Sequence, residues 1–259
     1  MSVTLVTQIG QLARRSVART LRQPAQIVPA LVFPLFLLAV NSSGLNDVTK
    51  LPHFPTSSYL TFALAITFMQ GAMFAMMNAG TNLAGDVETG FLNRLALTPL
   101  RGSALLTGML GGVLVLALIQ AATFLLVGLT AGAHVAAGVA GVLVIIALSF
   151  LMTLGFGALG SAAALRTGSG EAVQGLFPLF FVLLFLSSMS LPRNLIQTDW
   201  FREVATWNPV SYLIEAIRSL LIKGWDPEAL ALGFGVAIVL IVLGTVLASL
   251  ALRTRLVRT

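Results

Sequence analysis

Charge is scarce in this 259-residue sequence, and cysteine is absent. Charged residues make up 9% of the chain and hydrophobic residues 57%, which leaves too few charges to cover a water-soluble fold. The composition therefore predicts a membrane protein. The absence of cysteine excludes disulfides and thiolate metal sites, and it does not identify the compartment.

Motifs of soluble catalysis are also missing. The sequence has neither the His-Glu-x-x-His zinc motif nor the Gly-x-x-x-x-Gly-Lys-Ser/Thr loop through which a chain could hydrolyse a nucleotide. The stretch "GFGALG" at Gly155–Gly160 has the spacing of a dinucleotide loop, but it lies inside an apolar run with no strand before it. We interpret its glycines as sites of close helix packing. No catalytic residue, metal site or cofactor is predicted on this chain.

The sequence does contain six long runs without charge or histidine. Each is near or above the roughly 20 residues that a helical bilayer crossing needs. Continuous apolar runs favour helices over a membrane barrel, whose strands alternate in polarity. The predicted fold is an all-α polytopic membrane protein with one domain over residues 1–259. The six predicted transmembrane helices are Pro24–Val40, Tyr59–Leu83, Ala104–Ala131, Val135–Leu165, Ala172–Met189 and Ala229–Leu252.

The basic residues predict the orientation. An even number of spans places both termini on one side, which then holds ten of the fifteen basic residues. Lys and Arg are enriched in cytoplasmic loops, so both termini are predicted to be cytoplasmic. The net charge of +6 then reflects topology, and no nucleic-acid partner is expected. The ten residues are Arg14, Arg15, Arg19, Arg22, Arg94, Arg101, Arg166, Arg253, Arg255 and Arg258.

The first segment, residues 1–23, has an amphipathic pattern. Apolar residues recur at helical spacing, and four arginines occupy the remaining faces. Such a helix is typical of the anionic membrane interface, although charge that only sets the topology explains the arginines equally well. The apolar positions are Ile9, Leu12, Ala13, Val17 and Leu21, and the basic positions are Arg14, Arg15, Arg19 and Arg22.

The loop "GDVETGFLNRLALTPLRG" lies within residues 84–102 and carries charge between two apolar spans. Val87, Phe91, Leu92 and Leu95 share one arc at helical spacing, and Pro99 would end a helix there. A connector needs only a few polar residues, so an apolar arc favours a helix that docks against a partner. A solvated loop is the alternative.

A second charged segment, residues 191–228, precedes the last predicted span. Asn208 and Pro209 suit the first turn of a helix. The helix that follows is too apolar for open solvent, so we expect it to enter the membrane, with Glu215 and Arg218 pairing at i, i+3. An interfacial helix with a solvated ion pair is the alternative. Its apolar positions are Tyr212, Leu213, Ile214, Ile217, Leu220 and Leu221.

Polar side chains form a stripe on the span Tyr59–Leu83. Facing lipid would cost them energy, so the stripe is expected to face protein or a cavity. Hydrogen bonding between helices and a substrate path are both open. Methionines nearby and phenylalanines of the fifth predicted span would suit amphipathic cargo, and packing against lipid predicts the same residues. The stripe and its aromatic neighbours are Thr67, Gln70, Phe74, Asn78, Thr81 and Phe181.

Two stretches carry a family resemblance. "GDVETGFLNRLALTPLRGSALLTG" resembles the cytoplasmic loop of ATP-binding-cassette export permeases of the second type, with Glu-Thr-Gly at residues 88–90 where the family pattern has Glu-x-Gly-Thr. "WNPVSYLIEAIRSLL" at Trp207–Leu221 is similar to the segment that precedes the family's last span. The amphipathic amino-terminal helix and the six spans agree, so the resemblance covers essentially the whole chain.

This resemblance implies a permease in a bacterial cytoplasmic membrane that pairs with a second permease copy or homologue, with membrane lipids around it. It also implies two cytoplasmic ATPase subunits that hold ATP and Mg. Residues 84–102 would form a coupling helix seated in the ATPase, and re-entrant outer helices would gate the path. The implied coupling residues are Asp86, Glu88, Thr89, Gly90, Phe91 and Arg94, and the implied outer gate is Asn208, Pro209, Tyr212, Glu215 and Arg218.

The expected function is export of a hydrophobic or amphipathic compound such as a drug, antibiotic or lipid. A permease for a lipid-linked glycan is the runner-up. No pore filter indicates a channel, and the spans lack the ionisable residues of an ion-coupled carrier. An intramembrane serine hydrolase using Ser169 is the alternative from another class, but His53 and His134 are predicted on the opposite side of the membrane.

Overall fold

The computed structural model describes residues 5–96 and 102–257, and the described part is helical with no strand. An all-α fold is therefore confirmed. The helices are α1 (Leu5–Leu21), α2 (Pro24–Gly44), α3 (Tyr59–Glu88), α4 (Phe91–Ala96), α5 (Gly102–Thr130), α6 (Gly138–Thr167), α7 (Gly170–Phe185), α8 (Asp199–Trp207), α9 (Pro209–Ile222) and α10 (Pro227–Val257), with short 3-10 helices η1 (Asn46–Lys50) and η2 (Arg193–Leu195).

Five of the described helices, α2, α3, α5, α6 and α10, are long and apolar enough to cross a membrane. They correspond to five of the six predicted spans. The remaining prediction, Ala172–Met189, falls on α7, whose 16 residues rise only roughly 24 Å at 1.5 Å per residue. A bilayer core is roughly 30 Å thick. The sixth span therefore stays a prediction.

The helix α3 forms the centre of the bundle. Its most apolar stretch is 89% buried inside the protein, against 17% for α2 and α10. It packs against α2, α5, α6, α7 and α9, so it needs apolar or small residues on every side. The helices α2 and α10 instead expose aliphatic side chains along their length, as expected for surfaces that contact lipid.

Glycines let neighbouring helices approach closely, which confirms the interpretation of the "GFGALG" stretch. A Cβ on Gly160 would lie 2.1 Å from the backbone oxygen of Met76 on α3. A Cβ on Gly155 would lie 2.9 Å from Leu240 on α10. Since α6 therefore meets α3 on one side and α10 on another, these glycines hold the bundle together rather than cradle a phosphate.

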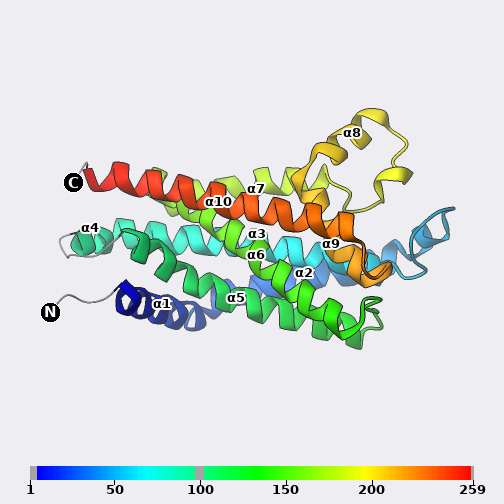
Figure 1. The fold of residues 1–259 in the computed structure, drawn as a ribbon, viewed down its shortest axis with the longest axis horizontal. Coiled ribbons are helices and arrows are strands. Elements are labelled where there is room, and N and C mark those ends of the chain that lie inside the picture. Colours follow the sequence, from blue (N-terminus) through cyan, green and yellow to red (C-terminus); the bar gives the residue numbers. More distant parts are fainter. Residues whose placement is uncertain (1–4, 97–101, 258–259) are drawn as a thin grey trace.

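The two ends of the bundle differ in content (Figure 1). The helices α1 and α4 and the carboxyl end of α10 lie at one end, which we call the α1 end. The helices α8 and α9 lie toward the opposite end, which we call the α9 end. The segments predicted to couple and to gate are thus at opposite ends, joined by α3.

Candidate coupling and gating sites

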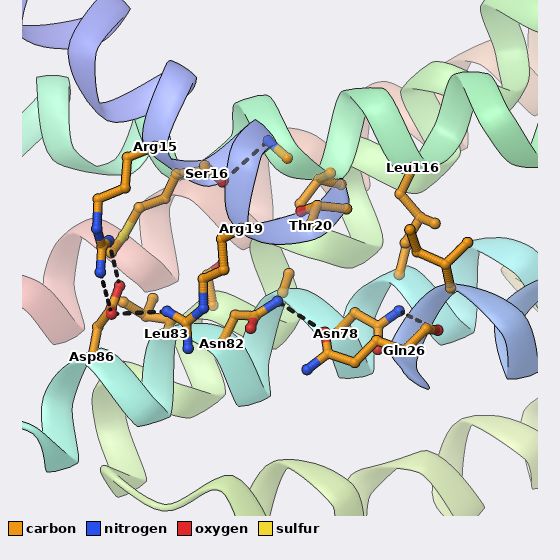
Figure 2. Close-up of a pocket in the computed structure, with 17 residues that line it drawn as sticks. Arg15, Ser16, Arg19, Thr20, Gln26, Asn78, Asn82, Leu83, Asp86 and Leu116 are labelled. Atoms are coloured by element: carbon orange, nitrogen blue, oxygen red, sulfur yellow. Dashed lines mark hydrogen bonds and ion pairs between the residues drawn. The ribbon is translucent and has the colours of Figure 1, made fainter. Parts of the chain in front are cut away.

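A buried carboxylate organises the α1 end. Asp86 lies in the last turns of α3 and is only 5% exposed. Arg15 of α1 donates to both of its oxygens, from Nη1 at 3.0 Å and from Nη2 at 2.8 Å, and Arg19 donates from Nη1 at 2.8 Å (Figure 2). Bidentate arginine–carboxylate pairs of this kind are strong and directional. The three side chains fix α1 against α3.

The position of Asp86 corrects its predicted role. The resemblance places Asp86 in a groove of the ATPase, whereas the structure turns its carboxylate inward to α1. The reason is that α3 does not stop at Leu83, the end of the predicted span, but continues to Glu88, so Asp86 keeps the helical register of the buried face. The hydrogen bonds with Asp86 raise the pKa of Arg15, which therefore keeps its charge in the pair.

A short helix, α4, follows α3, as the sequence predicts. Gly90 between them has φ +68°, a left-handed conformation that glycine adopts without strain. Leu92 is buried, and Phe91 lies under the guanidinium of Arg15, 3.8 Å from Cζ to the ring centroid. The apolar arc therefore docks on the protein itself. Pro99 and the side chain of Leu95 lie outside the described part of the chain.

Of the predicted coupling residues, Glu88, Thr89 and Arg94 are exposed. Glu88 Oε1 accepts from the backbone nitrogen of Gly170, the first residue of α7, at 3.2 Å. Thr89 Oγ1 donates to the Gly85 carbonyl at 2.7 Å, and Arg94 Nη2 donates to the Thr89 carbonyl at 3.4 Å. These groups are the part of the predicted coupling site that a partner can reach.

The four arginines at residues 14–22, in α1 and the turn after it, divide into two pairs. Arg14 and Arg22 are exposed, whereas Arg15 and Arg19 face Asp86. The apolar face of α1 packs on α5, where a Cβ on Gly108 would lie 3.2 Å from the Ile9 carbonyl. The helix predicted to lie in the interface is therefore also bound to the protein through its apolar face and two of its arginines.

Polar groups at the α9 end are held by the backbone. Asn208 caps α9, accepting at Oδ1 from Val210 N at 2.9 Å and donating from Nδ2 to the Leu183 carbonyl at 2.6 Å. Pro209 takes the first position of the helix, as predicted. The Tyr212 hydroxyl donates to the Thr206 carbonyl at 2.7 Å. These bonds tie α9 to α7 and α8.

The predicted pair between Glu215 and Arg218 is wrong. Glu215 accepts two hydrogen bonds from Arg193, from Nε at 2.7 Å and from Nη2 at 2.5 Å. Arg193 also lies over the ring of Tyr212, with 4.4 Å from Cζ to the ring centroid. Sequence reasoning missed Arg193 because it is 22 residues from Glu215, outside any helical spacing that a pattern could register.

Arg218 is 6% exposed and has no carboxylate partner among the described ion pairs. It donates to the carbonyls of Ser188 and Met189, each at 2.9 Å, and to the Phe62 carbonyl at 3.3 Å. Its Cζ lies 3.6 Å from the centroid of the Phe62 ring. The side chain thus joins α9, the turn after α7 and the first turn of α3.

An open cavity of about 680 Å³ adjoins this end. Its volume falls in the range of roughly 300 to 1,000 Å³ that is typical of small-molecule sites. Residues of the predicted gate line it together with Arg193. Acidic and basic groups are mixed around the wall, which gives it no single charge. The lining includes His53, Arg193, Tyr212, Glu215, Arg218, Lys223, Asp226 and Glu228.

The polar stripe of α3 is buried in helix contacts. Thr67 donates to the Leu64 carbonyl of its own helix at 2.6 Å, and Asn78 donates to the Gln26 carbonyl of α2 at 3.3 Å. Gln70 is 3% exposed. Asn78 thus fits hydrogen bonding between helices, one of the two readings left open by the sequence, whereas Thr67 bonds within its own helix.

A small cavity of about 40 Å³ lies beside this stripe, between α1, α2, α3, α5 and α6 (Figure 2). It is far below the roughly 300 Å³ of a drug-sized site. Inside it, Asn82 Nδ2 donates to Gln26 Oε1 at 3.0 Å. This cavity belongs to the packing of the bundle and is no passage for cargo in the conformation described.

Aromatic rings from α2, α3 and α7 form a group at the side of the bundle. Phe74 lies 5.7 Å from Phe33 and 5.2 Å from Phe177, centroid to centroid. Phe181 lies 6.1 Å from Phe33 and 5.0 Å from Phe177. The two predicted path residues Phe74 and Phe181 are therefore brought together through Phe177, one of the phenylalanines of the fifth predicted span, and through Phe33 of α2, which the path prediction did not include.

Ser169, weighed as a nucleophile, caps α7. Its Oγ accepts from the backbone nitrogen of Ala172 at 3.4 Å, which is the ordinary role of serine at a helix start. Among the residues that the structure describes, no group of three or more His, Cys, Asp and Glu gathers in a way that would hold a metal ion.

Comparison with known proteins gives concordant matches. Residues 7–222 match the family described as ABC-2 type transporter. The daunorubicin resistance ABC transporter permease protein DrrB1 of Streptomyces coeruleorubidus is 27% identical over 204 residues, which are 76% of this chain and 69% of that protein. Putative transport permeases ycf38 of Porphyra purpurea and Pyropia yezoensis are 24% and 29% identical, over 84% and 85% of this chain and 75% of each relative.

Proposed function

Because the chain belongs to the ABC-2 type transporter family, in which it is a multi-pass permease subunit and not itself a catalytic enzyme, we propose that it exports a hydrophobic or amphipathic compound. ATP hydrolysis on two separate ATP-binding-cassette subunits, which hold ATP and Mg, drives the export. The permease works with a second copy of itself or a homologue. It lies in a bacterial cytoplasmic membrane with the α1 end in the cytoplasm.

The observation that carries this proposal is the continuity of α3. Its 30 residues run from Glu88 at the exposed surface of the α1 end to Tyr59 at the α9 end. Asp86 joins α3 to α1 near one end, and Phe62 contacts Arg218 near the other. Since α3 is the most buried of the candidate spans, a displacement at Glu88 and Arg94 must move it against its neighbours.

The cargo class rests on the relatives and on the outer cavity. One relative is named for daunorubicin resistance, which favours a drug or antibiotic over a lipid-linked glycan. The 680 Å³ cavity is of suitable size, and its mixed charge suits an amphipathic molecule better than a strongly anionic one. The glycan permease remains the second candidate.

Coupling is tested with the double variant Glu88→Ala/Arg94→Ala. Both side chains are exposed, so the variant should insert and fold as the wild type does. If they contact the ATPase, their charges become partly desolvated there, and losing such contacts can cost roughly 2 to 5 kcal/mol of association. We expect the variant to lose the ATPase during purification from native membranes, or to retain it while losing most export.

The matched control is Asp47→Ala/Lys50→Ala, which removes one acid and one base from an exposed pair on η1. Mass spectrometry of the co-purified proteins and export rates in matched membranes compare the two variants. Wild-type association and export in the Glu88/Arg94 variant would refute the proposed coupling surface. Phe91 is left unchanged because it packs under Arg15, so its loss would disturb the fold as well.

A further inference from the structure

All three tryptophans of the chain lie within residues 200–225, and all are exposed. Trp200 is 62% exposed, Trp207 is 80% exposed and Trp225 is 57% exposed. A group of large apolar side chains exposed on one part of a protein surface often marks a site that contacts another protein or a membrane. In membrane proteins, tryptophan is enriched where the bilayer meets water, since its ring is apolar and its indole N–H is polar.

Two of these tryptophans lie on one stripe of α8. Trp200, Val204 and Trp207 are spaced i, i+4 and i+7, so they share a face, and all three are exposed. Ala205 is fully buried, and Arg202 Nη1 donates to the Ile196 carbonyl at 3.3 Å, so the helix is seated on the protein by another side. The apolar stripe is the part of α8 that the protein leaves uncovered.

The charged residues of α8 lie opposite this stripe and along one edge of it. Arg202 lies opposite the stripe and pairs with Asp199, and Glu203 lies at the edge beside the tryptophans; all three charged residues are exposed. A short helix with charged groups on one side and tryptophan on the other is the pattern of a helix that lies in the plane of the membrane interface. The charged side then faces the headgroups and water.

The placement of α8 agrees with this pattern. It projects to the side of the bundle near the α9 end, rather than along the axis of the long helices (Figure 1). One residue, Asp226, separates Trp225 from α10, and α10 is a candidate span whose apolar surface is mostly uncovered. A tryptophan at the end of a lipid-facing span marks the level of the interface.

We propose that α8 is a lipid-binding anchor, whose Trp200–Val204–Trp207 stripe inserts into the interface of the leaflet around the α9 end. The partner is a phospholipid surface, recognised by its headgroup–acyl boundary and by no single headgroup. The anchor goes beyond export itself and does not depend on the direction of transport. Because Asn208 is the only residue between α8 and α9, the depth of α8 also fixes the depth of α9 and of the outer cavity.

Tryptophan fluorescence tests the anchor directly, since the chain has no other tryptophan. Three variants each keep one tryptophan and replace the other two by phenylalanine. They are purified as the full chain and reconstituted in phosphatidylcholine vesicles that carry bromine at a shallow or a deep acyl position. We expect shallow bromine to quench Trp200 and Trp207 about twofold more than deep bromine, and aqueous iodide to quench them weakly.

Two reference variants in a tryptophan-free background calibrate the measurement. Asp47→Trp, on the exposed η1, should respond to iodide, and Leu243→Trp, midway along the uncovered side of α10, should respond most to deep bromine. Iodide quenching of Trp200 and Trp207 equal to that of Asp47→Trp would overturn the anchor in favour of a solvated helix.

Contact with a second copy of the chain is the other outcome that would overturn it. In that case, neither iodide nor bromine would quench Trp200 and Trp207, and dilution of the protein in lipid would restore quenching. A functional arm adds the variant Trp200→Ser/Trp207→Ser. We expect it to shift the emission of Trp225 to longer wavelength, because α9 and the start of α10 lose their depth. An unchanged Trp225 spectrum would show that the stripe does not set that depth.

Discussion

The two ends of the bundle each bury charge, but they stabilise it differently. At the α1 end, the carboxylate of Asp86 is held by two arginines that remain partly in contact with solvent, with side-chain exposures of 39% for Arg15 and 29% for Arg19. At the α9 end, Arg218 is itself buried and is held by three backbone carbonyls and an aromatic face.

The two sites therefore depend on different parts of the structure. The buried carboxylate of Asp86 is stabilised by opposite charge from another helix, so this stabilisation is lost if α1 moves away. The buried guanidinium of Arg218 is stabilised by carbonyls at fixed positions, so this stabilisation depends on the conformation of the turn at residues 188–189. The bonds to Asp86 are also directional, but the attraction between opposite charges falls off slowly with distance and survives a small movement, whereas bonds from Arg218 to backbone carbonyls depend on distance and direction alone. The α1 end is therefore better suited to transmit a displacement from one helix to another, and the α9 end to hold one defined conformation.

The largest expected effect comes from removing both charge partners of Asp86. In Arg15→Gln/Arg19→Gln, the carboxylate stays buried without a cation, and breaking a buried pair in this way costs about 3 to 5 kcal/mol. We expect a clear fall in the thermal midpoint of the purified chain in lipid nanodiscs. Adding Asp86→Asn should recover most of the loss, because no charge is then left buried.

The control for this prediction is Arg14→Gln/Arg22→Gln. It removes the same charge from α1 and the turn directly after it, but at exposed positions, so about 0 to 1 kcal/mol is expected. Equal destabilisation by the two double variants would mean that α1 is held by its overall charge at the membrane surface. The buried pair with Asp86 would then not be what fixes it.

A smaller effect is expected when Arg218 is changed. Arg218→Met leaves the Ser188 and Met189 carbonyls without their donors, at a cost of roughly 1 to 3 kcal/mol for an unsatisfied buried group. Removing a desolvated charge offsets part of this cost, so about 2 kcal/mol of destabilisation is expected. Thermal unfolding in nanodiscs measures it.

The variant Arg218→Lys separates the effect of the positive charge from the effect of the guanidinium's hydrogen-bond geometry. Lysine keeps the charge but lacks the planar fork that reaches several carbonyls and stacks on Phe62. We expect it to recover less than half of the loss. Full recovery by lysine would break the comparison, since the α9 end would then also depend on charge rather than on directional hydrogen bonds.

The sequence predicts the helices and their ends better than it predicts their partners. Hydropathy locates the five long apolar helices because each span must be apolar along its own length. The cap at Asn208 is likewise local, and it is confirmed. Asp86 belongs to the predicted coupling loop and Arg15 to the predicted amphipathic helix, but they lie 71 residues apart, and no local pattern links them.

Both residues were consequently assigned to partners outside the chain, Asp86 to the ATPase and Arg15 to the lipid interface. The same limit applies to Glu215. Helical spacing offers Arg218 as its partner, whereas the fold brings Arg193 of η2 to it. A sequence shows which charges are costly to bury, but packing between distant segments decides which of them meet.

The smallest expected effect concerns the Arg193–Glu215 pair, which shares one feature with the Asp86 site and one with the Arg218 site. It joins opposite charges, as at the α1 end, but it lies at the α9 end on the wall of the open cavity. Side-chain exposures of 21% and 29% leave both groups partly solvated, so water can replace much of the lost interaction. Arg193→Met should therefore cost about 1 kcal/mol, between an exposed pair and a buried charged hydrogen bond.

The charge reversal Arg193→Glu/Glu215→Arg makes this comparison sharper. If attraction between the charges is what matters, the reversed pair should recover part of the loss. Recovery should be incomplete, because the cation then leaves the face of Tyr212, where it gains about 0.5 to 1 kcal/mol at exposed sites. The exposed pair on η1, tested by Lys50→Met, provides the reference near zero. A loss in Arg193→Met as large as that in Arg218→Met would show that solvent exposure does not rank these sites, and the contrast between the two ends would then need another cause.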